Sequence, residues 1–177
     1  NVGANAFISY ENKILYLTVA FVAVVLVVLT TWHAAVALVI GSLMSGLAGL
    51  VGMKAATYTN VRVTNKANES RSIGETVKVA YRGGSVMGLS VGGFALLGLF
   101  IIYMVFGVGM GQAAETEASF TNFIGLHFNP FTMTLSGYAL GCSLVAMFNR
   151  VVGGIYTKAA DMGADLVGKT EAHIPED

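Results

Sequence analysis

Residues 14–53 read ILYLTVAFVAVVLVVLTTWHAAVALVIGSLMSGLAGLVGM and contain no Asp, Glu, Lys or Arg. Because a helix of about 20 apolar residues spans the hydrocarbon core of a bilayer, this run is long enough for two spans. The break between them is expected at residues 30–33, Thr-Thr-Trp-His, since tryptophan favours the membrane–water interface. The stretch therefore predicts two helices that cross a membrane in opposite directions.

Charged residues are scarce in the whole chain. They make up 11% of its 177 residues, against about 25% in a soluble domain. Residues 83–114 and 118–149 form two more runs without formal charge. We therefore predict an all-α polytopic membrane protein with four transmembrane helices, at about residues 12–31, 34–58, 76–107 and 131–168. The net charge of zero gives no support for nucleic-acid binding, which we do not expect.

The distribution of basic residues predicts the orientation. Between the second and third apolar runs lie Lys54, Arg62, Lys66, Arg71, Lys78 and Arg82. The connection at residues 108–130 carries Glu115 and Glu117 but no Lys or Arg. Because basic loops stay on the cytoplasmic side, we expect both ends, the loop 59–75 and the charged segment 158–177 in the cytoplasm. The loop 108–130 is then on the outer side of a multi-pass protein of the cell membrane.

Small residues recur at every fourth position along the apolar runs. They are Gly41, Ser45 and Gly49, then Ser42 and Gly46, then Gly84, Gly88 and Gly92, and finally Gly137 and Gly141. This spacing lets the backbones of neighbouring helices approach closely. It predicts contacts between helices rather than a direct chemical role.

A charged cluster follows the last apolar run, with Arg150, Lys158, Asp161 and Asp165. At 100° per residue these side chains fall within an arc of roughly 80° on one helix face. Two cations and two carboxylates on one face suit the binding of a metal–phosphate complex. The spacings of three and four also permit ion pairs within the helix, which is the alternative interpretation.

Ion pairing does not explain Arg150, which lies about 12 Å deeper along the helix axis than Lys158. An arginine inside a membrane is a functional candidate and needs a carboxylate partner. No acid in the other three predicted helices lies at its depth, so we expect the partner outside this stretch.

Residues 163–170, GADLVGKT, match the phosphate-loop pattern GxxxxGK[ST]. That motif needs a preceding strand and a helix that begins at the lysine. Here a helix leads in, and Asp165 would place a carboxylate inside the phosphate cradle. Nucleotide binding is therefore not expected.

Residues 150–177, RVVGGIYTKAADMGADLVGKTEAHIPED, resemble the ion-pumping membrane-bound pyrophosphatases. They contain the acidic motif of that family: Asp161, seven residues, Lys169, one residue and Glu171. Three other stretches are similar to the family: GANAFISYE from Gly3, GMKAATYTNVRVT from Gly52 and RGGSVMG from Arg82. The resemblance implies the second to fifth of about sixteen helices. Because Asn1 stands where a start methionine would, we expect an internal fragment.

The resemblance implies a role for the residues of the acidic pocket. Lys158 would contact pyrophosphate as the substrate-binding residue. Asp161, Asp165 and Glu176 would be the carboxylates that hold Mg²⁺, and Lys158, Asp161 and Asp165 would be catalytic. These roles are carried over from the family and do not follow from the spacing.

Three further residues have implied roles around that pocket. Lys169 and Glu171 would support it. Arg150 matches the arginine of an ion gate below the hydrolytic site and is counted with the catalytic set. The family implies a homodimer in a lipid bilayer that hydrolyses pyrophosphate to phosphate with Mg²⁺ and exports H⁺ or Na⁺. K⁺ dependence and the choice of ion depend on residues outside this stretch.

The chain also departs from the family pattern. Val152 replaces the first of three glycines after the Arg-Val pair, and Asn149 stands where a small residue is common. Met162 and Thr170 stand where valine is usual. None of these changes removes a charged functional group.

Two other classes of protein compete with a pyrophosphate-driven pump. A passive channel or secondary transporter would use the acidic end as a cytosolic cation or phosphate site and move ions without hydrolysis. A structural helical subunit would do neither and would tolerate neutralisation of Asp161 and Asp165. The set Lys158, Asp161, Asp165 and Glu176 favours the pump, because a passive path does not need it.

Overall fold

The computed structural model describes residues 2–114, 120–121 and 127–171. The described residues form four long helices: α1 (Val2–Leu29), α2 (Trp32–Ser70), α3 (Ile73–Ile102) and α4 (Pro130–Thr170). A π-helical turn, η1 (Tyr103–Gly109), and a 3₁₀ turn, η2 (Gln112–Ala114), follow α3. Two short strands, β1 (Phe120–Thr121) and β2 (His127–Phe128), pair antiparallel before α4.

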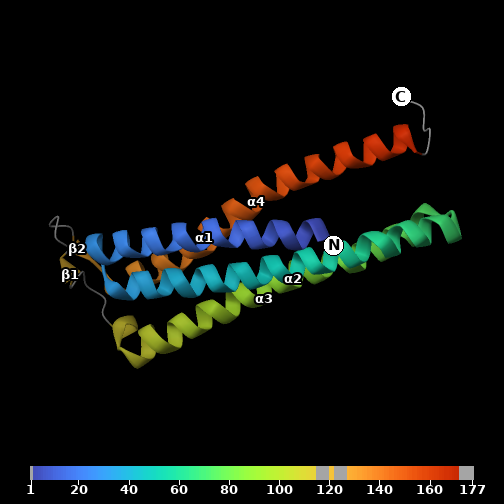
Figure 1. Ribbon diagram of the computed structural model, residues 1–177. Coiled ribbons are helices and arrows are strands. Elements are labelled where there is room, and N and C mark those ends of the chain that lie inside the picture. The colour runs from blue at the N-terminus through green and yellow to red at the C-terminus, as the bar shows by residue number, and fades with distance from the viewer. Residues whose placement is uncertain (1, 115–119, 122–126, 172–177) are drawn as a thin grey trace.

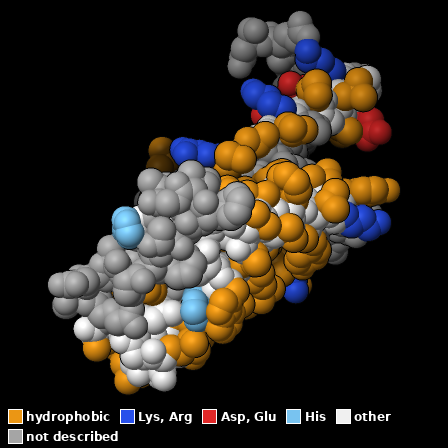
Figure 2. Space-filling view, turned by 90° about the vertical axis from the view of Figure 1, so that its left-hand side faces the viewer, with side chains coloured by type: hydrophobic (Ala, Val, Ile, Leu, Met, Phe, Trp, Pro, Cys, Tyr) orange, Lys and Arg blue, Asp and Glu red, His pale blue; other side chains and the backbone are white. Residues whose placement is uncertain are grey.

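Three of these helical stretches are long and apolar enough to cross a membrane: Trp32–Ser70, Ile73–Gly109 and Pro130–Ile155. The apolar part of α1, Lys13–Leu29, is shorter. Large apolar side chains such as Leu17 and Leu89 are about three-quarters exposed, at 75% and 77%. Figure 2 shows hydrophobic side chains over much of one face of the bundle. The predicted all-α membrane protein is confirmed, while a fourth span within α1 stays a prediction.

Helix α2 lies at the centre of the bundle. It forms an antiparallel hairpin with α3, and it contacts α4 and α1 (Figure 1). One buried cluster, Leu15, Val19, Leu38 and Val145, joins α1, α2 and α4. A second cluster, Ala37, Ile102, Phe106 and Tyr138, joins α2, α3, η1 and α4. Beyond this packed half, the charged end of α4 diverges from the α2–α3 hairpin (Figure 1).

The expected loop 59–75 is helical except for residues 71–72, which is a clear difference from the prediction. No Gly or Pro occurs in residues 54–73, so nothing in the sequence interrupts the helix once it leaves the apolar run. Arg71 ends α2 in the left-handed conformation, with φ 46°, and its N–H donates to the Ala67 carbonyl oxygen. Lys66 and Glu75 then pair across the turn at 3.0 Å. The predicted outer loop, 108–130, lies partly outside the described residues.

The backbones of α2 and α4 touch in the packed half. A Cβ added at Gly137 or Gly141 would collide with the carbonyls of Ala34 or Leu38 on α2. The hydroxyl of Ser45 donates to the Cys142 carbonyl oxygen at 3.2 Å. These glycines confirm the predicted small-residue contact. A Cβ at Gly84, Gly88 or Gly92 would have no neighbour within 4 Å among the described residues.

Candidate functional site

Helix α4 and its C-cap residue, Glu171, carry every described residue of the predicted site. The helix begins at Pro130, after the N-cap residue Asn129, whose side-chain oxygen accepts a hydrogen bond from the Thr132 N–H at 3.1 Å. It then runs without interruption from the apolar half into the charged half and ends with Lys169 in the last turn, where a cation favours the helix dipole. A displacement of the charged end can therefore be transmitted along one helix to Arg150.

The predicted catalytic side chains are accessible from outside the chain. Arg150, Lys158, Asp161 and Asp165 are all exposed. In the described part of the chain, no ion pair joins Lys158 to either aspartate. Ion pairing within the helix stays an alternative interpretation of the spacing. Both carboxylates are exposed, so a metal ion could reach their oxygens.

Asp161 and Asp165 lie one helical turn apart on the same face of α4. Carboxylate oxygens are the ligands that Mg²⁺ prefers, and one or two carboxylates with water and substrate phosphate commonly suffice. The donor set present therefore fits Mg²⁺. Among the described residues no group of three or more His, Cys, Asp or Glu side chains could hold a metal ion. Glu176 lies outside the described residues.

Lys169 and Glu171 lie at the end of α4, and both are exposed. The Glu171 N–H donates to the Val167 carbonyl oxygen at 2.9 Å and so closes the helix. The structure places them about three to four turns beyond Lys158 on the same helix. The side chain of Val152 lies outside the described part of the chain.

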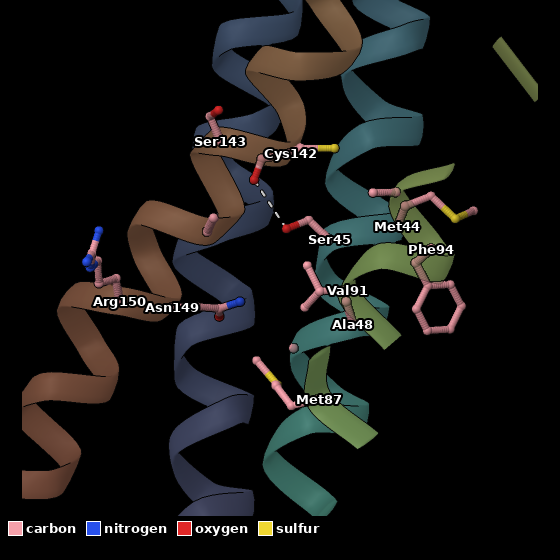
Figure 3. Close-up of a pocket in the computed structure, with 13 residues that line it drawn as sticks. Met44, Ser45, Ala48, Met87, Val91, Phe94, Cys142, Ser143, Asn149 and Arg150 are labelled. Atoms are coloured by element: carbon pink, nitrogen blue, oxygen red, sulfur yellow. Dashed lines mark hydrogen bonds between the residues drawn. The ribbon is translucent and has the colours of Figure 1, made fainter. Parts of the chain in front are cut away.

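A cavity of about 480 Å³ lies between α2, α3 and α4 (Figure 3). Arg150 and Asn149 line it together with apolar residues such as Met87 and Phe94. The hydrogen bond from the Ser45 hydroxyl to the Cys142 carbonyl oxygen joins α2 to α4 at the edge of this cavity (Figure 3). The structure thus places Arg150 beside a cavity in the apolar half of the molecule.

A second cavity of about 370 Å³ extends toward the charged end between α2 and α4. Its polar lining includes Asn60, Thr57 and Thr157. Asn149 and Gly49 line both cavities. The sequence alone marks Asn149 only as a departure from the family pattern. A polar side chain next to Arg150 in an uncharged run is the signal that could have identified it.

Comparison with known families identifies the chain. A family model described as inorganic H⁺ pyrophosphatase matches residues 1–177. The chain belongs to this family. The exposed lysine and carboxylates on α4 are therefore the side chains of an inorganic H⁺ pyrophosphatase segment.

Curated relatives agree with this membership. A K(+)-stimulated pyrophosphate-energized sodium pump of Thermotoga maritima is 56% identical over 175 residues, which cover 99% of this chain and 24% of the relative. A K(+)-insensitive pyrophosphate-energized proton pump 2 of Moorella thermoacetica is 40% identical over 99% of this chain and 23% of the relative. The pyrophosphate-energized membrane proton pump 3 of Arabidopsis thaliana is 42% identical over 80% of this chain and 16% of its own length.

The chain thus spans about a quarter of the length of the two bacterial pyrophosphatase relatives, 24% and 23%. Its three long apolar helices and its membership in this family make it an integral membrane protein. Relatives named as sodium pumps and as proton pumps both match nearly the whole chain.

Proposed function

We propose that this chain is part of a longer protein, the parent protein, that hydrolyses pyrophosphate to phosphate with Mg²⁺ and transports Na⁺ or H⁺ across the membrane. One observation carries the proposal. In a chain of the inorganic H⁺ pyrophosphatase family, a single helix bears Lys158, Asp161 and Asp165 exposed at one end and Arg150 in its apolar half. The printed names of the relatives support the same activity.

The residues suit the chemistry of the substrate. Pyrophosphate carries a high negative charge that repels an attacking water. The ammonium group of Lys158 would bind and partly neutralise it, and Asp161, Asp165 and Glu176 would hold Mg²⁺. When bound, Mg²⁺ supplies further neutralisation of the phosphate oxygens. Positioning and electrostatic stabilisation account for most of such catalysis.

The remaining parts of the proposal concern the assembly. The chain would contribute four of about sixteen transmembrane helices to each subunit of a homodimer, with the charged end of α4 in the cytoplasm. Figure 1 supports this topology, because the α2–α3 turn and the end of α4 lie at the same end of the molecule. Lys169 and Glu171 would support the pocket, and K⁺ would be a further activator if this protein follows the K(+)-stimulated relatives.

Asp161→Ala in the parent protein tests the hydrolytic role. Mg²⁺-dependent phosphate release is measured in membrane vesicles, with internal pH and Na⁺ followed and K⁺ present or absent. Met162→Ala is the matched control, because it truncates the neighbouring exposed side chain on another face of α4. We expect Asp161→Ala to lose at least about a hundredfold in turnover, since it removes a ligand of the charge-neutralising metal.

The outcomes separate the classes of protein. Phosphate release that is lost in Asp161→Ala, kept in Met162→Ala and accompanied by ion uptake would establish the pump and its ion. Ion movement without turnover would favour a passive channel or secondary transporter. Well-folded wild-type protein with neither activity would leave only a structural role.

Arg150→Ala tests the gate. We propose that substrate binding shifts α4 and changes the carboxylate partners of the guanidinium, which opens or closes the ion path. Ions transported per pyrophosphate hydrolysed should therefore fall while hydrolysis persists. An unchanged ratio would contradict the gate role.

A further inference from the structure

Asn149 lies where α4 leaves α2. Nearer the start of α4, Gly137 and Gly141 bring the two backbones into contact. Further along α4, a Cβ at Gly153 or Gly154 would have no neighbour within 4 Å in the described part of the chain. Between these regions the Asn149 side chain lies against α2, with its Nδ2 atom 2.7 Å from where a Cβ of Gly49 would be.

The contact depends on the absence of a side chain at position 49. A Cβ 2.7 Å from a nitrogen is closer than real Cβ atoms come to their neighbours, so any other residue at position 49 would push the amide away. Gly46, one turn earlier on α2, differs, because a Cβ there would have no neighbour within 4 Å among the described residues. Gly49 therefore leaves a notch on α2 that the flexible end of the Asn149 side chain occupies, and a methyl group at position 49 would displace that end.

Asn149 is also the immediate neighbour of Arg150. Consecutive residues on an α-helix point about 100° apart. Figure 3 shows the Asn149 side chain directed toward α2 and the Arg150 side chain directed away from it. A rotation of α4 that moves one of these side chains must move the other, because both are fixed to the same rigid backbone turn.

The free space around Asn149 would let it move. Cavities of about 480 Å³ and 370 Å³ lie beside it, and Asn149 and Gly49 line both. Lys158 lies nine residues further along the exposed part of α4, about 13 Å away along the axis. A movement of α4 near Lys158 would therefore also move Asn149 against α2 at Gly49.

We propose that Asn149, seated in the Gly49 notch, is a positioning residue that sets the rotation of α4 and thereby the direction of the Arg150 guanidinium. Movement of the charged end of α4 shifts the amide in this notch and turns Arg150 with it. This inference rests on the proposed function, since it assigns the contact that couples hydrolysis to the gate.

The test compares Gly49→Ala, Asn149→Ala and the double variant in vesicles that contain the parent protein. The readout is the number of ions transported per pyrophosphate hydrolysed, which a loss of folded protein alone would not change. We expect each single variant to lower this ratio about tenfold, because a misplacement of about 1 Å at a positioned group can cost about a hundredfold and the shift expected here is smaller. The double variant should recover most of it, since the methyl group added at position 49 then occupies the space that the amide vacates.

Gly46→Ala is the matched control and should keep the wild-type ratio. Unchanged ratios in Asn149→Ala and in folded Gly49→Ala would overturn the inference while leaving the pump intact. If Gly49→Ala does not fold, Asn149→Ala alone decides, because it only removes atoms. If the wild-type protein does not hydrolyse pyrophosphate, the proposed function is wrong, and this inference is wrong as well.

Discussion

Gly141→Ala should weaken the attachment of α4 to α2. The added methyl group would collide with the Leu38 carbonyl oxygen and would lie 2.9 Å from the Leu38 carbonyl carbon and 3.0 Å from its Cα. Because carbon atoms pack at about 3.5–4.0 Å, the helices must separate by roughly 0.5–1 Å. The separation also lengthens the hydrogen bonds that Ser42 and Ser45 donate to carbonyl oxygens of α4, at 3.4 and 3.2 Å.

The expected cost follows from these two effects. Overpacking costs about 1–3 kcal/mol, and a hydrogen bond between membrane helices contributes about 0.6 kcal/mol, so together we expect about 2–4 kcal/mol. Gly46→Ala provides the reference, because it gains the same helix propensity, about 1 kcal/mol, without a neighbour within 4 Å in the described residues. The difference between the free energies of unfolding of Gly141→Ala and Gly46→Ala therefore measures the contribution of the contact between α2 and α4.

The measurement is the free energy of unfolding of the parent protein in detergent. It is obtained by denaturant titration, with a fluorophore attached to α4 that reports when this helix leaves its packed position. Gly141→Ala should unfold at lower denaturant than Gly46→Ala. If the two variants unfold at the same concentration, the close approach of α2 and α4 is not a stabilising contact and the reasoning fails.

Two further predictions concern the ends of the bundle. Thr134 is fully buried, and its hydroxyl lies within hydrogen-bond distance of two acceptors, the Pro130 carbonyl oxygen at 2.9 Å and the Gln112 side-chain oxygen at 3.1 Å, so Thr134→Val should cost about 1–3 kcal/mol by removing the donor that these oxygens share. The same unfolding assay checks this, with Ser136→Ala, whose hydroxyl bonds only within α4, as control, and equal unfolding curves would contradict it. Arg71→Gly should stabilise the α2–α3 turn by about 1 kcal/mol, because a left-handed φ of 46° strains any residue with a Cβ. Hydrogen exchange of residues 65–75 should slow relative to Arg71→Ala, and identical exchange would show that the turn is unstrained.

The membrane character and the charged face of α4 could be predicted from the sequence. The cost of placing a charge in a bilayer belongs to each residue, so runs such as residues 14–53 are informative without any knowledge of contacts. The common face of Lys158, Asp161 and Asp165 follows from helical periodicity, a local property of the backbone. The resemblance of residues 150–177 to the pyrophosphatases likewise needs only the order of the residues, and the family comparison confirms it.

The tertiary structure alone decided which small residues are contacts. Gly141 contacts the backbone of α2. Gly88 also belongs to a series of small residues at every fourth position, but a Cβ there would have no neighbour within 4 Å among the described residues. The tertiary structure also decided that Asn149 fits the Gly49 notch. These features depend on how far one helix is rotated and tilted against another. Rotation and tilt are set by the summed packing of residues far apart in the sequence, so no local pattern specifies them.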